Sequence, residues 1–144
     1  MEPSDNGLVE LSRPECLRLL ATAHIGRIGL SMGALPVVLP VNFVLDGESV
    51  VFRTSEGAKQ QAAVSNTVVA FEVDHVNPLY HSGWSVLVTG VAKLVTDRLE
   101  LARLAQLPLQ PWMPGEQGNY VRISADRISG RRLHPERAYA AEIS

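Results

Sequence analysis

The stretch that decides the fold is LPVVLPVNFVLDGESVVFRTSEGAKQQAAV, residues 35–64. It contains two apolar runs rich in β-forming residues, 35–45 and 49–54, with Asp46-Gly47 where the first run ends. Asp-Gly between two such runs is among the strongest sequence signals for a β-hairpin, because both residues tolerate the positive φ angles of a tight turn. We therefore expect the two runs to pair as antiparallel strands.

The same stretch indicates where in the sheet the strand at 35–45 lies, and it predicts a helix after the strand at 49–54. Pro36 and Pro40 have no backbone N–H to give to a sheet ladder, which makes this an edge, bent or bulged strand. After the second strand, Ser55 can cap a helix, and the Ala, Lys and Gln residues beyond it favour helix formation. A short helix is expected over residues 55–66.

Short apolar runs separated by turn residues continue on both sides. A helix is expected over residues 12–23, where Ser12 and Glu15 have the spacing of a capping box, and another over residues 98–106. Gly90 lies within a long apolar run and is expected to mark a bend. The remaining strands are expected at 25–32, 67–73, 84–95 and 119–133, the last being a strand with its continuation.

Strands joined by short turns, with isolated helices between them, indicate a mainly β member of the α+β class and disfavour a parallel sheet. A six-stranded antiparallel β-barrel of Greek-key type accounts for all the apolar runs. A chain of 144 residues has the size of one ordinary domain. We expect a flexible N-terminal arm at residues 1–11 and a single domain over residues 12–144.

The composition favours self-association and disfavours several other partners. Apolar residues make up 46% of the chain and charged residues only 19%, so part of the apolar surface is expected to be buried against another chain. A net charge of -2 gives no general attraction to nucleic acid or anionic membranes. With no apolar run of membrane-spanning length and an acidic start unlike a secretory signal, the chain is expected to be cytoplasmic.

The segment RTSEGAK, residues 53–59, carries the densest group of candidate binding residues. The hydroxyls of Thr54 and Ser55 and the cations of Arg53 and Lys59 lie where a predicted strand meets a predicted helix. Hydroxyls, cations and a helix N-terminus are the components of phosphate sites. On the residues alone the alternative stays open, that the serine only caps the helix and the two cations are solvated.

Two further groups are candidates for contact with a flat ligand. Pro40-Val41-Asn42-Phe43 places a polar amide in an apolar strand, where it can bind either the edge of a heterocycle or a buried backbone group. Trp84 and Ser85 begin a later strand. The indole can stack on an aromatic ligand, and it can equally belong to the core or to a dimer interface.

Metal binding and nucleophilic catalysis find little support. The only cysteine is Cys16, and the four histidines, His24, His75, His81 and His134, are scattered. A metal or haem ligand near His75 and His81 is one interpretation, and solvent-exposed loop histidines are the other. Because the histidines are scattered, no metal site is assigned. No serine lies in a GxSxG motif, and no catalytic residue is assigned either.

Four segments together resemble the pyridoxamine 5'-phosphate oxidase-like family of split-barrel flavoproteins, in its short bacterial, nitroimidazole-reductase-like branch. They are GRIGL at 26–30, the stretch 35–64, VVAFEVD at 68–74 and GWSVLVTGVAKLVTD at 83–97. The resemblance covers residues 14–133. It implies an FMN cofactor at the two-fold interface of a homodimer.

The resemblance also assigns roles to the candidate residues. Arg53, Thr54, Ser55 and Lys59 would hold the FMN phosphate. The strand Pro40-Val41-Asn42-Phe43 would line the isoalloxazine ring. Trp84 and Ser85 would reach the flavin bound mainly by the other subunit.

The implied activity is that of an FMN-dependent oxidoreductase acting on an unidentified small molecule, with the flavin carrying out the hydride chemistry. The tail RRLHPERAYAAEIS is short, and Arg131 and Arg132 are the only nearby cations that could imitate the substrate-binding segment of the vitamin-oxidising members. We therefore do not expect pyridoxamine phosphate oxidation. The alternatives are a deazaflavin-dependent reductase and a non-catalytic protein that binds or senses flavin or haem.

Overall fold

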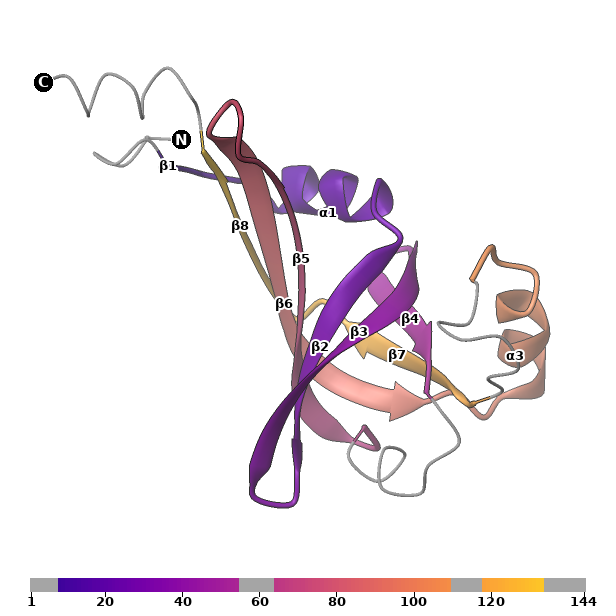
Figure 1. The fold of residues 1–144 in the computed structure, drawn as a ribbon. Helices are drawn as coiled ribbons and strands as arrows, with labels where there is room; N and C mark the ends of the chain where they lie inside the picture. Colours follow the sequence, from indigo (N-terminus) through magenta and orange to yellow (C-terminus); the bar gives the residue numbers. More distant parts are fainter. Residues whose placement is uncertain (1–7, 55–63, 110–117, 134–144) are drawn as a thin grey trace, which may run out of the picture.

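A computed structural model describes residues 8–54, 64–109 and 118–133, and Figure 1 shows their arrangement. The elements are β1 (Leu8–Glu10), α1 (Arg13–Ala21), β2 (Ile25–Met32), β3 (Leu35–Asp46), β4 (Ser49–Arg53), β5 (Thr67–Asn77), β6 (Ser82–Leu94), α3 (Arg98–Leu104), β7 (Tyr120–Ser124) and β8 (Arg127–Leu133). Most of the helix expected over 55–66 lies outside the described residues.

The eight described strands belong to one antiparallel sheet that closes on itself. The order is β1-β8-β6-β5-β2-β3-β4-β7, and β7 also pairs with β6. The six strands from β6 to β7 therefore form a closed barrel, while β8 and β1 extend the sheet beyond it on the β6 side (Figure 1). The prediction of a mainly β fold with a six-stranded antiparallel barrel is confirmed.

The turns and helix caps agree with the sequence signals. Gly47 in the β3–β4 hairpin and Gly33 in the β2–β3 hairpin both have positive φ angles, of 62° and 66°. At the start of α1, the Ser12 side chain accepts a hydrogen bond from the backbone N–H of Glu15. Asp97 caps α3 in the same way.

Two differences from the expected elements concern the ends of the domain. Residues 119–133 form two strands, because the chain turns at Ala125-Asp126 between β7 and β8. Within the arm expected over residues 1–11, Leu8–Glu10 form strand β1, which pairs with the end of β8. A three-residue strand is too short to show a period of two, so its pairing is not visible in the sequence.

Gly90 marks the point where β6 changes partners. Up to Thr89 this strand pairs with β8, and from Ala92 onward it pairs with β7. A Cβ atom on Gly90 would collide with the carbonyl oxygen of Ser124, which lies just before the turn from β7 to β8. The glycine thus allows the close backbone approach that the change of partner requires.

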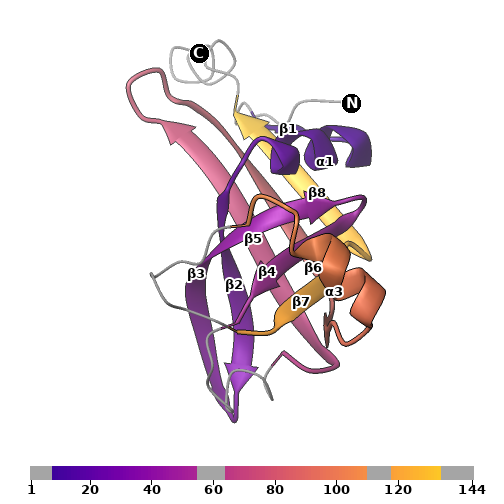
Figure 2. The same ribbon diagram turned by 90° about the vertical axis from the view of Figure 1, so that its right-hand side faces the viewer.

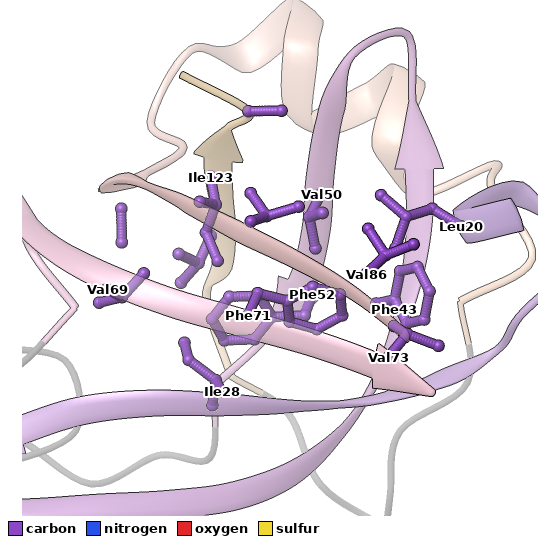
Figure 3. Packing of buried hydrophobic residues seen from close by; sticks show 14 of the residues in the cluster. Leu20, Ile28, Phe43, Val50, Phe52, Val69, Phe71, Val73, Val86 and Ile123 are labelled. Atoms are coloured by element: carbon purple, nitrogen blue, oxygen red, sulfur yellow. The ribbon is translucent and has the colours of Figure 1, made fainter. Parts of the chain in front are cut away.

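The core fills the barrel and continues under α1. Side chains at alternate positions of the strands point inward, and Phe43 and Phe71 make an edge contact with ring centroids 4.8 Å apart (Figure 3). Cys16, Leu19 and Leu20 on one face of α1 are buried against this cluster. The helix therefore covers one end of the barrel.

Helix α3 is held to the outside of the barrel by packing and by ion pairs. Leu104 packs against Val51 of β4. Figure 2 shows α3 lying beside β4 and β7. Asp46 at the end of β3 binds Arg103 of α3 at 2.8 Å and Arg122 of β7 at 2.7 Å. Hydrogen bonds from these two arginines lower the pKa of Asp46 to about 2. In the described part of the chain, no helix is long and apolar enough to cross a membrane.

Candidate functional site

Arg53 lies at the end of β4 and is fixed from the neighbouring strand. Its Nε and Nη2 atoms donate to the carbonyl oxygen of Gly118, at 3.3 and 3.0 Å, and its guanidinium lies over the ring of Tyr120. A guanidinium has five N–H donors. This arrangement holds a cation at the barrel rim, and within the described part of the chain its Nη1 group has no hydrogen-bond partner.

Thr54 continues from Arg53 but has a different environment. It is only 4% exposed, its backbone N–H donates to Asn119 O at 2.9 Å, and its hydroxyl donates to the same oxygen at 3.4 Å. Because the hydroxyl hydrogen is used in this way, Thr54 anchors the segment in the described structure. Ser55 and Lys59, the other two predicted phosphate ligands, lie outside the described residues.

The predicted ring-binding strand divides its side chains between two faces. Val41 and Phe43 point toward the core, and Phe43 is 2% exposed with its N–H donating to His24 O. The Asn42 side chain points to the opposite, outer face of the sheet, where it lies across from Ile25. Pro40 is exposed on this same outer face. Of the four residues, only these two can therefore present side chains to a ligand outside the barrel.

Trp84 and Ser85 also point to opposite faces, because they are consecutive strand residues. Ser85 points to the outer face of the sheet, and its ladder partners are Asp74 and Arg131. Trp84 points to the core side of the sheet, where it is partly buried against the core, and its ladder partner is His75. The structure thus separates two side chains that the sequence treats as one group.

An open hollow of about 300 Å³ lies beside Trp84 at the end of the barrel covered by α1. Its lining consists of Thr22, Ala23, Ile25, Val73, Asp74, His75 and Trp84. Among these, the indole and the imidazole are ladder partners, so a planar ligand entering the hollow would meet two ring systems.

A second hollow, of about 340 Å³, lies on the outer face of β2, β3 and β5. Gly29, Val38 and Ala70 form its apolar part. Arg27, Glu72 and Asp74 also line it, and none of these three is among the site residues predicted from the sequence. The sequence contains one signal for this acidic group. In VVAFEVD, residues 68–74, the two acidic residues are two positions apart, so they lie on the same face of a strand.

The histidines do not form a metal site in the described structure. His24, His75 and His81 are exposed, and His134 lies outside the described ranges. Among residues 8–54, 64–109 and 118–133 there is no group of three or more His, Cys, Asp or Glu side chains arranged to hold a metal ion.

Residues 12–132 match the family model for pyridoxamine 5'-phosphate oxidase. The chain belongs to the pyridoxamine 5'-phosphate oxidase-like family. This family match spans α1, the whole barrel, α3 and all but the last residue of β8, so the resemblance seen in the sequence is confirmed along nearly the full domain.

Individual family members support the assignment. An uncharacterised protein of Mycobacterium tuberculosis, Rv0080, is 38% identical over 131 residues, which are 88% of this chain and 86% of the relative. The structure of an FAD binding protein from Mycobacterium smegmatis is 37% identical with a TM-score of 0.74, covering 87% of this chain and 97% of that one. A Corynebacterium glutamicum structure is 35% identical with a TM-score of 0.79, covering 90% and 96%.

Proposed function

We propose that this family member binds a flavin nucleotide whose riboflavin phosphate lies at the end of β4. The observation that carries the proposal is Arg53, whose guanidinium is fixed by Gly118 and Tyr120 directly before the segment containing Ser55 and Lys59. A guanidinium, a serine and a lysine form a donor set that fits a phosphate. The chemistry of the residues therefore agrees with the family membership.

FMN is the form of the nucleotide that we propose. The Mycobacterium smegmatis relative is by name an FAD binding protein, and FAD contains the same riboflavin phosphate unit followed by an adenylate. The proposed contacts at Arg53, Ser55 and Lys59 are common to both nucleotides. A direct comparison of the two affinities decides between them.

We further propose that the flavin ring lies against the Pro40–Phe43 strand at the interface of a homodimer, where Trp84 or Ser85 of a second copy completes the site. The outer face of the barrel supports this arrangement, since Val38, Val68 and Leu87 are 67%, 68% and 43% exposed there. Exposed apolar side chains that gather on one face are typical of interaction surfaces. A second copy would bury them and exclude water from the ring.

The proposed activity is the oxidation or reduction of a small molecule. When bound, the flavin supplies the hydride chemistry, so the chain needs only to bind, orient and shield it. Arg53 would hold the phosphate, and the backbone of β3 would fix the edge of the ring. The dimer interface would form the cavity in which a substrate meets the flavin.

Titration of the apoprotein with FMN, FAD, riboflavin, a deazaflavin and haem tests the proposed cofactor. We expect tight binding of FMN, and a Lys59→Ala variant should lose about 10- to 100-fold in affinity, as expected for a charge-assisted hydrogen bond. Lys93→Ala is the matched control, because the exposed Lys93 on β6 is the only other lysine of the chain. Preference for haem or the deazaflavin would contradict the proposal.

Oxidoreductase activity needs its own test. The holoprotein is mixed with NADH or NADPH under oxygen, and the rate of nucleotide oxidation is compared with that of an equal concentration of free flavin. A rate well above that of free flavin supports the activity. An equal rate contradicts the activity with this class of donor and leaves the binding function standing.

A further inference from the structure

Three charged side chains form a cluster on the outer face of the barrel. Arg27 of β2 lies opposite Glu72 of β5 in the ladder, and its Nη1 atom is 3.5 Å from Glu72 Oε1 and 3.3 Å from Asp74 Oδ2. Both carboxylates thus share one cation. When all three groups are ionised, the cluster carries a net charge of -1.

The surroundings of this cluster are almost entirely apolar or neutral. On β3, the residue opposite Arg27 is Pro40, and on β6 the residues opposite Glu72 and Asp74 are Leu87 and Ser85. The nearest further charge in these ladder rows is Arg131 of β8, which lies across from the serine. In the described strands, no second cation therefore faces Glu72 from a neighbouring strand.

This environment acts on the protonation of Glu72. Partial burial, followed by the hydrogen bond and the repulsion from Asp74, raises the pKa of Glu72 to about 7, and Arg27 opposes the rise. The Glu72 side chain is still 35% exposed in the isolated chain. An apolar surface that covers it would remove that remaining hydration and favour the neutral form further.

We propose that the outer face of β2, β3, β5 and β6 binds a second copy of this chain and that Glu72 is protonated in that interface. The proposal rests on the dimer of the proposed function and adds the proton. Val38, Val68 and Leu87 supply the exposed apolar area. A two-fold contact places a patch against itself, so a patch that carries both an arginine and carboxylates can pair charges of opposite sign with its own copy.

The charge count explains why the proton is needed. Two copies with ionised Glu72 would bring a net charge of -2 into an apolar contact, since each cluster has one arginine and two carboxylates. Protonation of Glu72 in both copies leaves Arg27 and Asp74 as balanced pairs. Burying an unbalanced charge is far less favourable than burying a neutral carboxylic acid that is hydrogen-bonded.

Self-association should therefore weaken as the pH rises through the pKa of Glu72. Each copy takes up as much as one proton on association, so the dimer dissociation constant should rise by about tenfold or more between pH 7 and pH 8. Below about pH 6 the carboxyl is already protonated in the monomer, and the dissociation constant should change little there.

Sedimentation velocity of the full-length protein at several concentrations and at pH 6, 7 and 8 tests the proposal. We expect the wild type to dissociate progressively with rising pH, and Glu72→Gln, which mimics the protonated acid, to remain dimeric at pH 8. Glu48→Gln is the control, because Glu48 is exposed on the β3–β4 turn and pairs with Arg13 away from this face. It should keep the wild-type pH dependence.

The outcomes separate this inference from the proposed function. A chain that is monomeric at every pH, with or without Glu72→Gln, contradicts the dimer and the inference together. A dimer whose dissociation constant does not change with pH, or changes equally in Glu72→Gln, contradicts only the role of the proton. Titration with FMN at pH 6, where the wild type and Glu72→Gln are both expected to be dimeric, tests the cofactor site separately from the role of the proton.

Discussion

The guanidinium carbon of Arg53 lies 4.7 Å from the centroid of the Tyr120 ring, and the same two residues are partners in the β4–β7 ladder. The ladder fixes the two backbones, and the ring then fixes the side chain of the arginine. A cation–π contact of this kind contributes about 0.5–2 kcal/mol. In the proposed site, Tyr120 therefore orients the cation for the phosphate without touching the cofactor.

Replacing the tyrosine tests this positioning role. Tyr120→Leu should weaken FMN binding by about 3- to 10-fold through loss of the cation–π contact. Tyr120→Phe keeps the ring and should bind FMN as the wild type does. Isothermal titration calorimetry with FMN and with riboflavin distinguishes this role from a general loss of folding, because only the binding of the phosphorylated ligand should depend on Arg53.

The ion pairs of Asp46 should make the fold sensitive to acid. The pKa of Asp46 is lowered from 3.8 to about 2, so its ionised form stabilises the fold above its ordinary pKa, and this contribution is lost as the pH falls through about 2. Asp46→Asn should lower the free energy of unfolding at pH 7 by about 1–3 kcal/mol. It should also reduce the dependence of stability on pH below about 4.

Urea unfolding followed by circular dichroism measures both effects. Asp126→Asn provides the control, since Asp126 is exposed near the turn between β7 and β8 and makes no ion pair with any residue of the described ranges. An Asp46→Asn variant that is as stable as the wild type at pH 7 would show that α3 is held by packing alone.

Gly26 is expected to be intolerant of a side chain. A Cβ atom there would lie 2.7 Å from Cε1 of Phe71 and closer still to Cζ, and this ring is fully buried in edge contact with Phe43. Gly26→Ala should destabilise the protein by about 1–3 kcal/mol. In a Phe71→Leu background, the same substitution should be less destabilising, because the shorter side chain leaves room; equal effects in both backgrounds would contradict the steric explanation.

Cys16 should be chemically silent in the native state. The thiol is fully buried under α1, and burial, followed by repulsion from Glu15, raises its pKa. Reaction with Ellman's reagent at pH 8 should be at least about 100-fold slower in buffer than in denaturing urea, because the reactive species is an accessible thiolate. Rapid reaction of the native protein would mean that the helix does not stay on the end of the barrel.

Much of the fold can be predicted because its signals are local. Asp46-Gly47 specifies one hairpin, Ser12 begins α1, and apolar alternation locates the long strands. Local sequence patterns do not show which distant strands pair with each other. The change of partner at Gly90 and the addition of β1 to β8 depend on residues far apart in the chain, and a sequence pattern gives no register for such pairs.

The candidate site can be predicted less completely than the fold. Arg53 is visible in sequence as a cation at a strand end, whereas its partners Gly118 and Tyr120 come from a distant part of the chain. Trp84 and Ser85 are neighbours in sequence, although strand geometry turns them to opposite faces. The Arg27 cluster escapes a local pattern because its members come from two strands that are not adjacent in the sequence.

The ratio of the affinities for FMN and riboflavin, measured for the wild type and for Arg53→Gln, shows whether the end of β4 holds the flavin phosphate. If the end of β4 holds the flavin phosphate, the wild type should bind FMN at least about 100-fold more tightly than riboflavin. Arg53→Gln should reduce that ratio by about tenfold or more while leaving riboflavin affinity unchanged. Equal affinities for the two ligands in the wild type would contradict a phosphate site at the end of β4.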